Sequence, residues 1–337
     1  MACTLPLDVL TKESPQLYVK AVSLPYKTHS LQRQASKNTE VTNQHGSMSN
    51  LPAHAPGQTY CDVSALEAGH VRVPLDYLID TAKGGETREL PSLSFLLRHS
   101  QNGDIFVFDL GIPKDLQTLP PMYHERIAQM FAINVPEDAA DSLAKGGLDP
   151  TAVKHLCYSH IHFDHIGDSR PYTNATFLVG AAARPLATNG WPADPKSLFS
   201  QNLLPEGRTR FLDPAHWPPL GPFPHALDFY GDGSLYIIDA PGHMPGHINV
   251  LTRTSPDGGW IYLAGDSGHD RRLLTGEAHI PVHQVYGCAH GDKEVAAAHL
   301  ARIRALMETY PRVRVLLAHD VPWYEEGVLE PASRAKK

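Results

Sequence analysis

Cysteine is scarce in this chain, and long apolar runs are missing. The four cysteines, Cys3, Cys61, Cys157 and Cys288, show no paired spacing over 337 residues. They therefore indicate reduced thiols and not a disulfide framework. No apolar stretch approaches the roughly 20 residues that a membrane span requires, and no cationic start precedes an apolar stretch as in a signal peptide. These absences predict a cytoplasmic protein without a membrane partner.

Positive charge is also in short supply. Lysine and arginine number 29 against 36 acidic residues, which gives a formal charge of -7. Because phosphate binding needs a basic surface, we expect no nucleic-acid partner. The 42% of hydrophobic residues is enough for a sizeable buried core.

The composition divides the chain into two parts. Residues 1–58 are polar and rich in Gln, Ser, Asn and Thr around 31–50. They are expected to form an arm that is either partly disordered or wraps a second subunit, and the second alternative gives a homodimer. Residues 59–330 are expected to form one domain.

Short apolar runs and helical spacing predict a mixed α and β structure for this domain. Strands are expected at 93–97, 105–109, 153–158, 176–179, 226–230, 234–239, 247–252, 260–264 and 313–317. Helices are expected from Pro121, at 181–187 and around 303–310. Residues 190–225, rich in proline and aromatics, are either a surface excursion or a wall or lid over a site.

Histidine and aspartate gather after predicted strands in a pattern typical of metal ligands. The run His160-Ile161-His162-Phe163-Asp164-His165 places four such side chains within six residues. Three more follow in Pro-Gly-His, Ala-Gly-Asp and Leu-Ala-His-Asp, namely His243, Asp266 and His319. Imidazole and carboxylate suit zinc, and also iron or cobalt. The two loop imidazoles can share one cation, and a carboxylate such as Asp266 can bridge two metals about 3.5–4 Å apart.

These motifs resemble the metallo-β-lactamase superfamily, whose mark is a His-X-His-X-Asp-His loop. The sequences Phe-Tyr-Gly-Asp-Gly-Ser at 229–234 and Ala-Pro-Gly-His-Met-Pro-Gly-His at 240–247 are similar to the branch that opens N-acyl-homoserine lactones. The resemblance implies an α+β fold, a four-layer αββα sandwich, with two Zn²⁺ ions at one edge and a small-molecule substrate.

The resemblance also implies a role for each residue. The first metal would be held by His160, His162, His243 and Asp266, and the second by Asp164, His165, Asp266 and His319. His247 is an alternative to His243 but is expected to be structural. Asp109 would brace the histidine loop without binding metal. A hydroxide between the metals would attack a carbonyl carbon, with Asp164 also acting in catalysis by orienting it.

One position departs from the lactonase pattern. The lactonases carry a tyrosine three residues beyond the bridging aspartate, where this chain has His269. An imidazole there could donate a hydrogen bond or protonate a leaving nitrogen, so His269 is the second predicted catalytic residue. Cyclic esters, cyclic amides such as γ-lactams, and thioesters therefore all stay open as substrates. The other histidines, including His279, His283 and His290, are expected at the surface or in the core.

The leading hypothesis is a dinuclear zinc hydrolase that opens a lactone or γ-lactam. One alternative is a thioesterase of the glyoxalase II type, although the helical domain of that enzyme is not apparent. Another is a non-catalytic metal-binding module, but no ligand of the pattern is lost. An iron oxidoreductase would need a flavin domain, and no glycine-rich flavin loop follows a strand.

Overall fold

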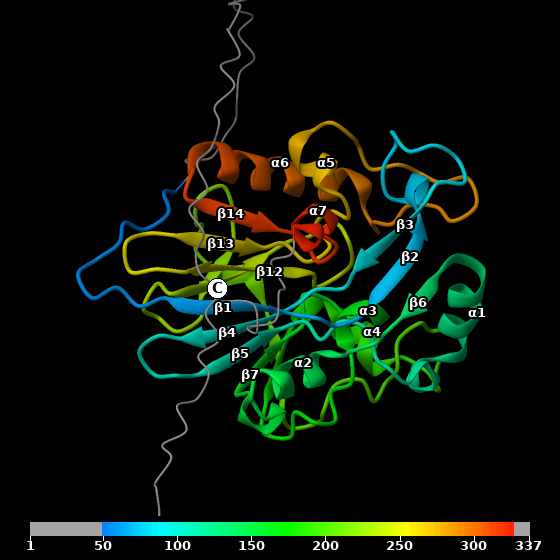
Figure 1. Ribbon diagram of the computed structural model, residues 1–337, viewed down its shortest axis with the longest axis horizontal. Coiled ribbons are helices and arrows are strands. Elements are labelled where there is room, and N and C mark those ends of the chain that lie inside the picture. Colours follow the sequence, from blue (N-terminus) through cyan, green and yellow to red (C-terminus); the bar gives the residue numbers. More distant parts are fainter. Residues whose placement is uncertain (1–48, 327–337) are drawn as a thin grey trace, which may run out of the picture.

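Two β-sheets packed face to face form the centre of the molecule, with helices on both outer sides (Figure 1). The computed structural model describes residues 49–326. The six-stranded sheet has the order β1 (Cys61–Leu66), β4 (Ser94–His99), β5 (Ile105–Phe108), β7 (His155–Cys157), β8 (Thr176–Gly180) and β9 (Thr209–Leu212). The five-stranded sheet has the order β10 (Ala226–Asp228), β11 (Leu235–Asp239), β12 (Ile248–Arg253), β13 (Trp260–Leu263) and β14 (Val313–Leu316).

The central strands, such as β5 and β11, are apolar on both faces, and this explains the four layers. In β5, Phe106 and Phe108 pack between the sheets, whereas Ile105 and Val107 pack under the outer helices. The same alternation holds along β11, because successive side chains of a strand point to opposite faces. A sheet with two apolar faces must be covered on both. The predicted α+β, αββα architecture is therefore confirmed.

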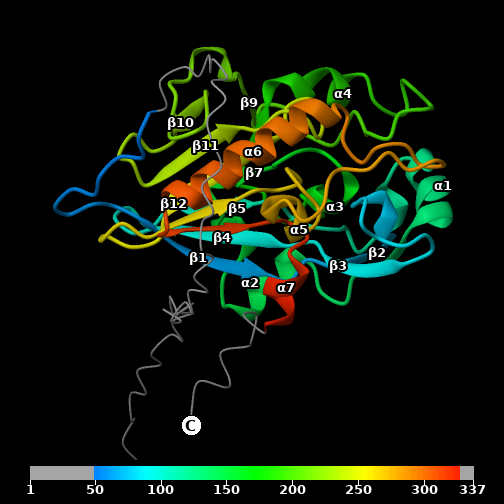
Figure 2. The ribbon, with the colours of Figure 1, turned by 90° about the horizontal axis from the view of Figure 1, so that it is seen from above.

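Helices α5 (Arg271–Thr275) and α6 (Lys293–Thr309) cover the five-stranded sheet (Figure 2). Along α6, Ala296, Leu300, Ile303 and Leu306 are buried at helical spacing. Asp292 caps its first turn by accepting a hydrogen bond from the Val295 N–H. The six-stranded sheet is covered by α1 (Pro121–Met130), α2 (Ala139–Lys145), α3 (Phe163–Ile166) and α4 (Arg184–Thr188), while α7 (Val321–Glu325) ends the described chain.

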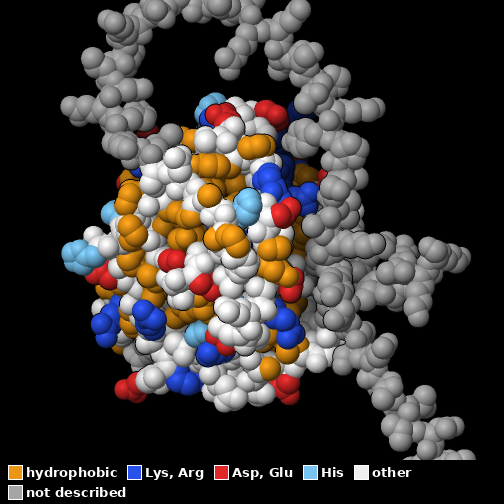
Figure 3. All heavy atoms as spheres, turned by 90° about the vertical axis from the view of Figure 1, so that its left-hand side faces the viewer, with side chains coloured by type: hydrophobic (Ala, Val, Ile, Leu, Met, Phe, Trp, Pro, Cys, Tyr) orange, Lys and Arg blue, Asp and Glu red, His pale blue; other side chains and the backbone are white. Residues whose placement is uncertain are grey.

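A smaller sheet, with the order β3 (Thr87–Pro91), β2 (His70–Pro74) and β6 (Ala132–Asn134), extends one end of the sandwich. It was not predicted. The opposite end presents apolar side chains interspersed with charges of both signs (Figure 3). No helix within residues 49–326 is long and apolar enough to cross a membrane.

The predicted hairpins and the helices from Pro121 and around 303–310 are confirmed as β4–β5, β10–β11, α1 and α6. The prediction of one helix over 181–187 is wrong in detail, because a 3₁₀ turn over Ala181–Ala183 precedes α4. Residues 190–225 are not wholly irregular either, since β9 pairs in parallel with β8.

Most of the predicted arm, residues 1–48, lies outside the described residues. Its remaining part lies against the domain. Leu51 is buried in the core beneath α6, and its N–H donates to the Tyr310 hydroxyl at 3.1 Å. The buried guanidinium of Arg253 donates to the Pro52 carbonyl at 2.7 Å.

Candidate metal centre

Loops from both sheets meet at one end of the sandwich. The loop of the histidine motif leads from β7 into α3, which Figure 1 shows at this end. His243 follows β11, Asp266 follows β13, and His319 follows β14. The structure thus brings together all seven side chains that the sequence singled out as metal ligands.

Three imidazoles and one carboxylate form the first group. His160 Nε2 lies 2.9 Å from His162 Nδ1, and His243 Nε2 lies 3.1 and 2.9 Å from these two atoms. Asp266 Oδ2 lies 3.5 Å from His243 Nε2 and 3.7 Å from His160 Nε2. Donors bound to zinc at 2.0–2.1 Å in a tetrahedron lie about 3.3 Å apart. The four groups therefore fit one zinc ion.

The second group shares the carboxylate of Asp266. His165 Nε2 lies 3.3 Å from Asp266 Oδ2, while His319 Nε2 lies 3.3 Å from Asp266 Oδ1. Asp164 Oδ2 lies 3.6 Å from His319 Nε2. Because the two oxygens of Asp266 face both groups, this residue has the geometry of a bridge between two cations.

The protonation states of the first group also suit a cation. Burial holds the pKa values of His160 and His243 well below the ordinary histidine range and lowers the pKa of His162 to about 4. Burial alone would raise the pKa of Asp266, but His165, His319 and His269 together hold it well below its usual value. Neutral imidazoles and an ionised carboxylate are the forms that bind metal. In the second group burial is outweighed by the nearby carboxylates, which raise the pKa values of His165 and His319, so these two rings would release a proton when a metal binds.

Unpartnered atoms support the same fit. His165 Nε2 and Asp266 Oδ1 are buried and have no hydrogen-bond partner among residues 49–326. Burying such atoms without a partner costs free energy. A cation between them would remove this cost.

Asp109 braces the loop from outside. Its Oδ2 accepts hydrogen bonds from His165 Nδ1 at 2.9 Å and Ser159 Oγ at 2.7 Å, and its Oδ1 accepts from the Ser159 N–H at 2.6 Å. In the described chain it is the one non-glycine residue with a positive φ, 61°, a strained conformation that is common at functional sites. Its bond fixes the proton of His165 on Nδ1 and leaves Nε2 free for a metal.

His247 is excluded from the donor groups by its own hydrogen bonds. Its Nδ1 donates to the Ala240 carbonyl at 2.9 Å, and its Nε2 accepts from the Asp266 N–H at 3.1 Å. Both ring nitrogens are therefore used. Gly265, which directly precedes Asp266, has φ +47°, and a Cβ there would lie 2.9 Å from His247 Nε2. Only glycine fits between this ring and the Asp266 turn.

Two further histidines border the donor groups. His269 Nε2 lies 3.2 Å from Asp266 Oδ2, and its ring stacks on His319 at 5.9 Å. His290 is 4% exposed, and its ring lies 4.9 Å from His269 and 5.2 Å from His243. Sequence reasoning did not single out His290, because it lies on an irregular segment without a spacing motif.

The segment 190–225 reaches the site at one point. The ring of Phe199 stacks on His162, with centroids 6.1 Å apart and planes 17° apart. Leu198, Leu203 and Leu204 pack beside it against the core under the six-stranded sheet. Phe199 therefore covers one side of His162 in the first donor group.

The comparisons with known proteins agree with this geometry. A family model described as the metallo-beta-lactamase superfamily matches residues 87–307. Gamma-lactamase FDB1 of Fusarium pseudograminearum is 33% identical over 207 residues, covering 58% of this chain and 50% of that protein. The chain thus spans about half the length of that relative. N-acyl homoserine lactonase AttM of Rhizobium radiobacter is 28% identical over 191 residues, covering 56% of this chain and 69% of that protein.

A solved structure shows the same fold. It is an N-acyl homoserine lactone hydrolase with the product N-hexanoyl-L-homoserine at its catalytic metal centre. The TM-score is 0.62 with 16% identity, covering 80% of this chain and 96% of that chain. On the family match, the fold and the donor geometry together, this chain belongs to the metallo-β-lactamase superfamily.

Proposed function

We propose that this protein is a dinuclear zinc hydrolase that opens a small cyclic ester or cyclic amide. The observation that carries the proposal is the pair of donor groups joined by the Asp266 carboxylate. The relatives support the ring chemistry, because the name of one specifies a γ-lactam and the name of the other a homoserine lactone.

His160, His162 and His243 would hold the first metal, and Asp164, His165 and His319 the second, with Asp266 on both. When bound, zinc lowers the pKa of water to about 7 and polarises a carbonyl oxygen. Iron or cobalt also accepts these donors. Zinc is favoured because the first group has the spacing of a tetrahedral shell.

The chain's own residues would position the reactants. Asp164 orients the attacking nucleophile, because its carboxylate faces His319 at the second group. His269 has a buried Nδ1 without a partner among the described residues, so it can donate a hydrogen bond to the substrate carbonyl or to the leaving atom. The ring of Phe199 excludes water from the side of His162.

Metal analysis combined with turnover tests this proposal. Zinc-replete protein is expected to hold about two equivalents of zinc and to hydrolyse a chromogenic lactone or lactam. His162→Ala should lose at least one equivalent and more than about 100-fold in kcat/KM, because one of three imidazoles of the first group is removed. His216→Ala is the matched control, since His216 is exposed on a turn. Full turnover with stoichiometric zinc in His162→Ala would refute the proposal.

A further inference from the structure

His290 is a buried imidazole that the described part of the chain leaves without hydrogen bonds. Its side-chain atoms Nδ1 and Nε2 are both buried and both lack a partner among residues 49–326. Ring nitrogens of His290, His269 and His243 lie within 4.8 Å of one another. His290 therefore lies beside the proposed site and has its full hydrogen-bonding capacity available.

Backbone hydrogen bonds hold the segment that carries His290 against the loop of His243. The Gly291 N–H donates to the His243 carbonyl at 2.8 Å, and the Asp292 N–H donates to the Gly242 carbonyl at 2.9 Å. The His290 N–H itself contacts Cys288 Sγ at 3.4 Å. The position of His290 is thus tied to the loop that carries His243.

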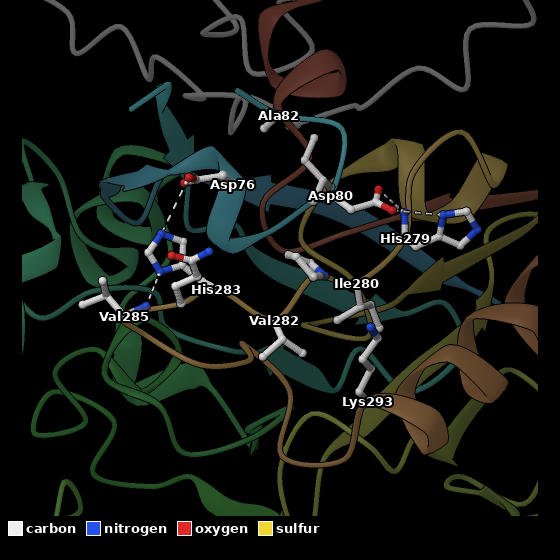
Figure 4. A pocket seen from close by; sticks show the side chains of 12 residues that line it. Asp76, Asp80, Ala82, His279, Ile280, Val282, His283, Val285 and Lys293 are labelled. Carbon is white, nitrogen blue, oxygen red and sulfur yellow. Dashed lines mark hydrogen bonds and ion pairs between the residues drawn. The ribbon is translucent and has the colours of Figure 1, made fainter. Parts of the chain in front are cut away.

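The residues that precede His290 in the chain, 279–283, are also held by contacts to the rest of the domain. Figure 4 shows His279 beside Asp80 and His283 beside Asp76, and these two pairs belong to the lining of a hollow of about 620 Å³. The ion pairs measure 3.3 Å and 3.6 Å. With both sets of contacts in place, the ring of His290 is presented to the site by a supported segment.

A buried imidazole with two unpaired nitrogens is costly, so a polar group is expected to meet it. An uncharged imidazole offers one N–H donor and one bare nitrogen acceptor. The N–H of a cyclic amide can donate to this bare nitrogen. A lactone offers no donor and would leave the bare nitrogen unpaired.

We infer that His290 is a substrate-binding residue that recognises the N–H of a cyclic amide, so that the site prefers lactams to lactones of the same shape. This inference rests on the proposed function and names its substrate class. Sites built to pair with a substrate N–H discriminate strongly against analogues that lack it. The alternative is that His243, His269 and His290 hold a third cation, and the experiment below distinguishes the two roles of His290.

Three probes with the same bicyclic skeleton separate these outcomes: oxindole, a γ-lactam; N-methyloxindole, without the N–H; and 2-coumaranone, the γ-lactone. Calorimetry on zinc-loaded protein should show oxindole binding at least about 10-fold more tightly than N-methyloxindole. In His290→Leu this preference should vanish, while the zinc content stays at the parent level. His290→Gln, which keeps a donor and an acceptor, should restore part of the preference.

Turnover adds the second readout. In His290→Leu, kcat/KM for oxindole should fall about 10- to 100-fold further than kcat/KM for 2-coumaranone. An unchanged binding preference, an equal fall for both substrates, or the loss of a metal equivalent in His290→Leu would overturn the inference. Parent protein that hydrolyses neither ring would overturn the proposed function instead, while the binding preference would still decide the role of His290.

Discussion

Replacing Asp109 by asparagine should weaken one metal site and spare the other. The carboxylate accepts three hydrogen bonds, one of them from His165 Nδ1. In Asp109→Asn the carbonyl oxygen can still accept from the Ser159 N–H, but the new NH₂ group then faces His165. His165 would have to move its proton to Nε2, the atom that faces Asp266. A ring protonated there has no lone pair for a metal.

The size of the effect follows from the kind of contact. Removing the hydrogen-bond partner of a ligating histidine typically costs about 10- to 100-fold in metal affinity, or about 1.4–2.7 kcal/mol. Asparagine tolerates the positive φ of 61° at this position, so backbone strain should not add to this figure. Asp109→Ala lacks that advantage and would also leave a cavity.

Zinc titration against a competing chelator measures the two sites separately. The weaker site of Asp109→Asn should shift by about 10- to 100-fold. The other, with His160, His162 and His243, should change less than about threefold, because Asp109 Oδ2 reaches His160 only through Ser159 Oγ. Asp80→Asn is the control, since Asp80 lies at the surface. Parent-like binding at both sites, or loss of the first site alone, would refute the reasoning.

Two further predictions concern stability. Gly265→Ala should lower both the zinc content and the Tm, since its Cβ would collide with His247 and Ser159. Gly57→Ala is the control, because Gly57 also has a positive φ but has open space around it, so this variant reports the backbone strain alone. Equal effects of the two substitutions would exclude the collision as the cause. Burial lowers the pKa of His299 to about 3. As the pH falls through about 6.5, His299 therefore becomes protonated in the unfolded chain but stays neutral in the folded protein. The resulting stability is present above pH 6.5 and is lost as the pH falls. Between pH 7 and 5, urea unfolding of chelator-treated His299→Gln should therefore lose about 2 kcal/mol less than the parent, and identical losses would contradict the pKa shift.

The sequence revealed most where the signal is local. The His-X-His-X-Asp-His run follows a strand and needs only its own spacing to predict a metal loop, and the structure places each of those four side chains at the site. The hairpin of β4 and β5 is equally local, because Asn102-Gly103 sits between two apolar runs. Such features depend on neighbours in sequence.

His290 and β9 were missed for the opposite reason. His290 reaches the site because the next two residues, Gly291 and Asp292, donate to the carbonyls of His243 and Gly242, far away in sequence, and no spacing rule reports such a contact. Thr209–Leu212 forms β9 inside a proline-rich segment, where composition predicts loops. It becomes a strand because β8 offers a parallel edge and because Arg208 donates to the carbonyls of Tyr172 and Ala175.

The division of the donors between the sheets links metal binding to folding. The histidine loop and Asp109 follow strands of the six-stranded sheet, whereas His243, Asp266 and His319 follow strands of the five-stranded sheet. A cation held by both sets would join the sheets at one end, so its binding free energy would stabilise the packed pair. At a free zinc concentration about 1,000 times Kd this amounts to about 4 kcal/mol, a large part of the 5–15 kcal/mol typical of a domain.

The loops that carry the donors are irregular, and their order depends on the packing of the two sheets. The turn before His243 depends on Gly242, where φ is +125° and a Cβ would lie 2.4 Å from the backbone nitrogen of Ala296. The turn before Asp266 depends on Gly265 in the same way. Glycine gives such turns little intrinsic order, because it loses the most backbone freedom on folding. Their order must come from contacts that only the assembled sheets provide, namely α6 against Gly242 and His247 against the Asp266 N–H.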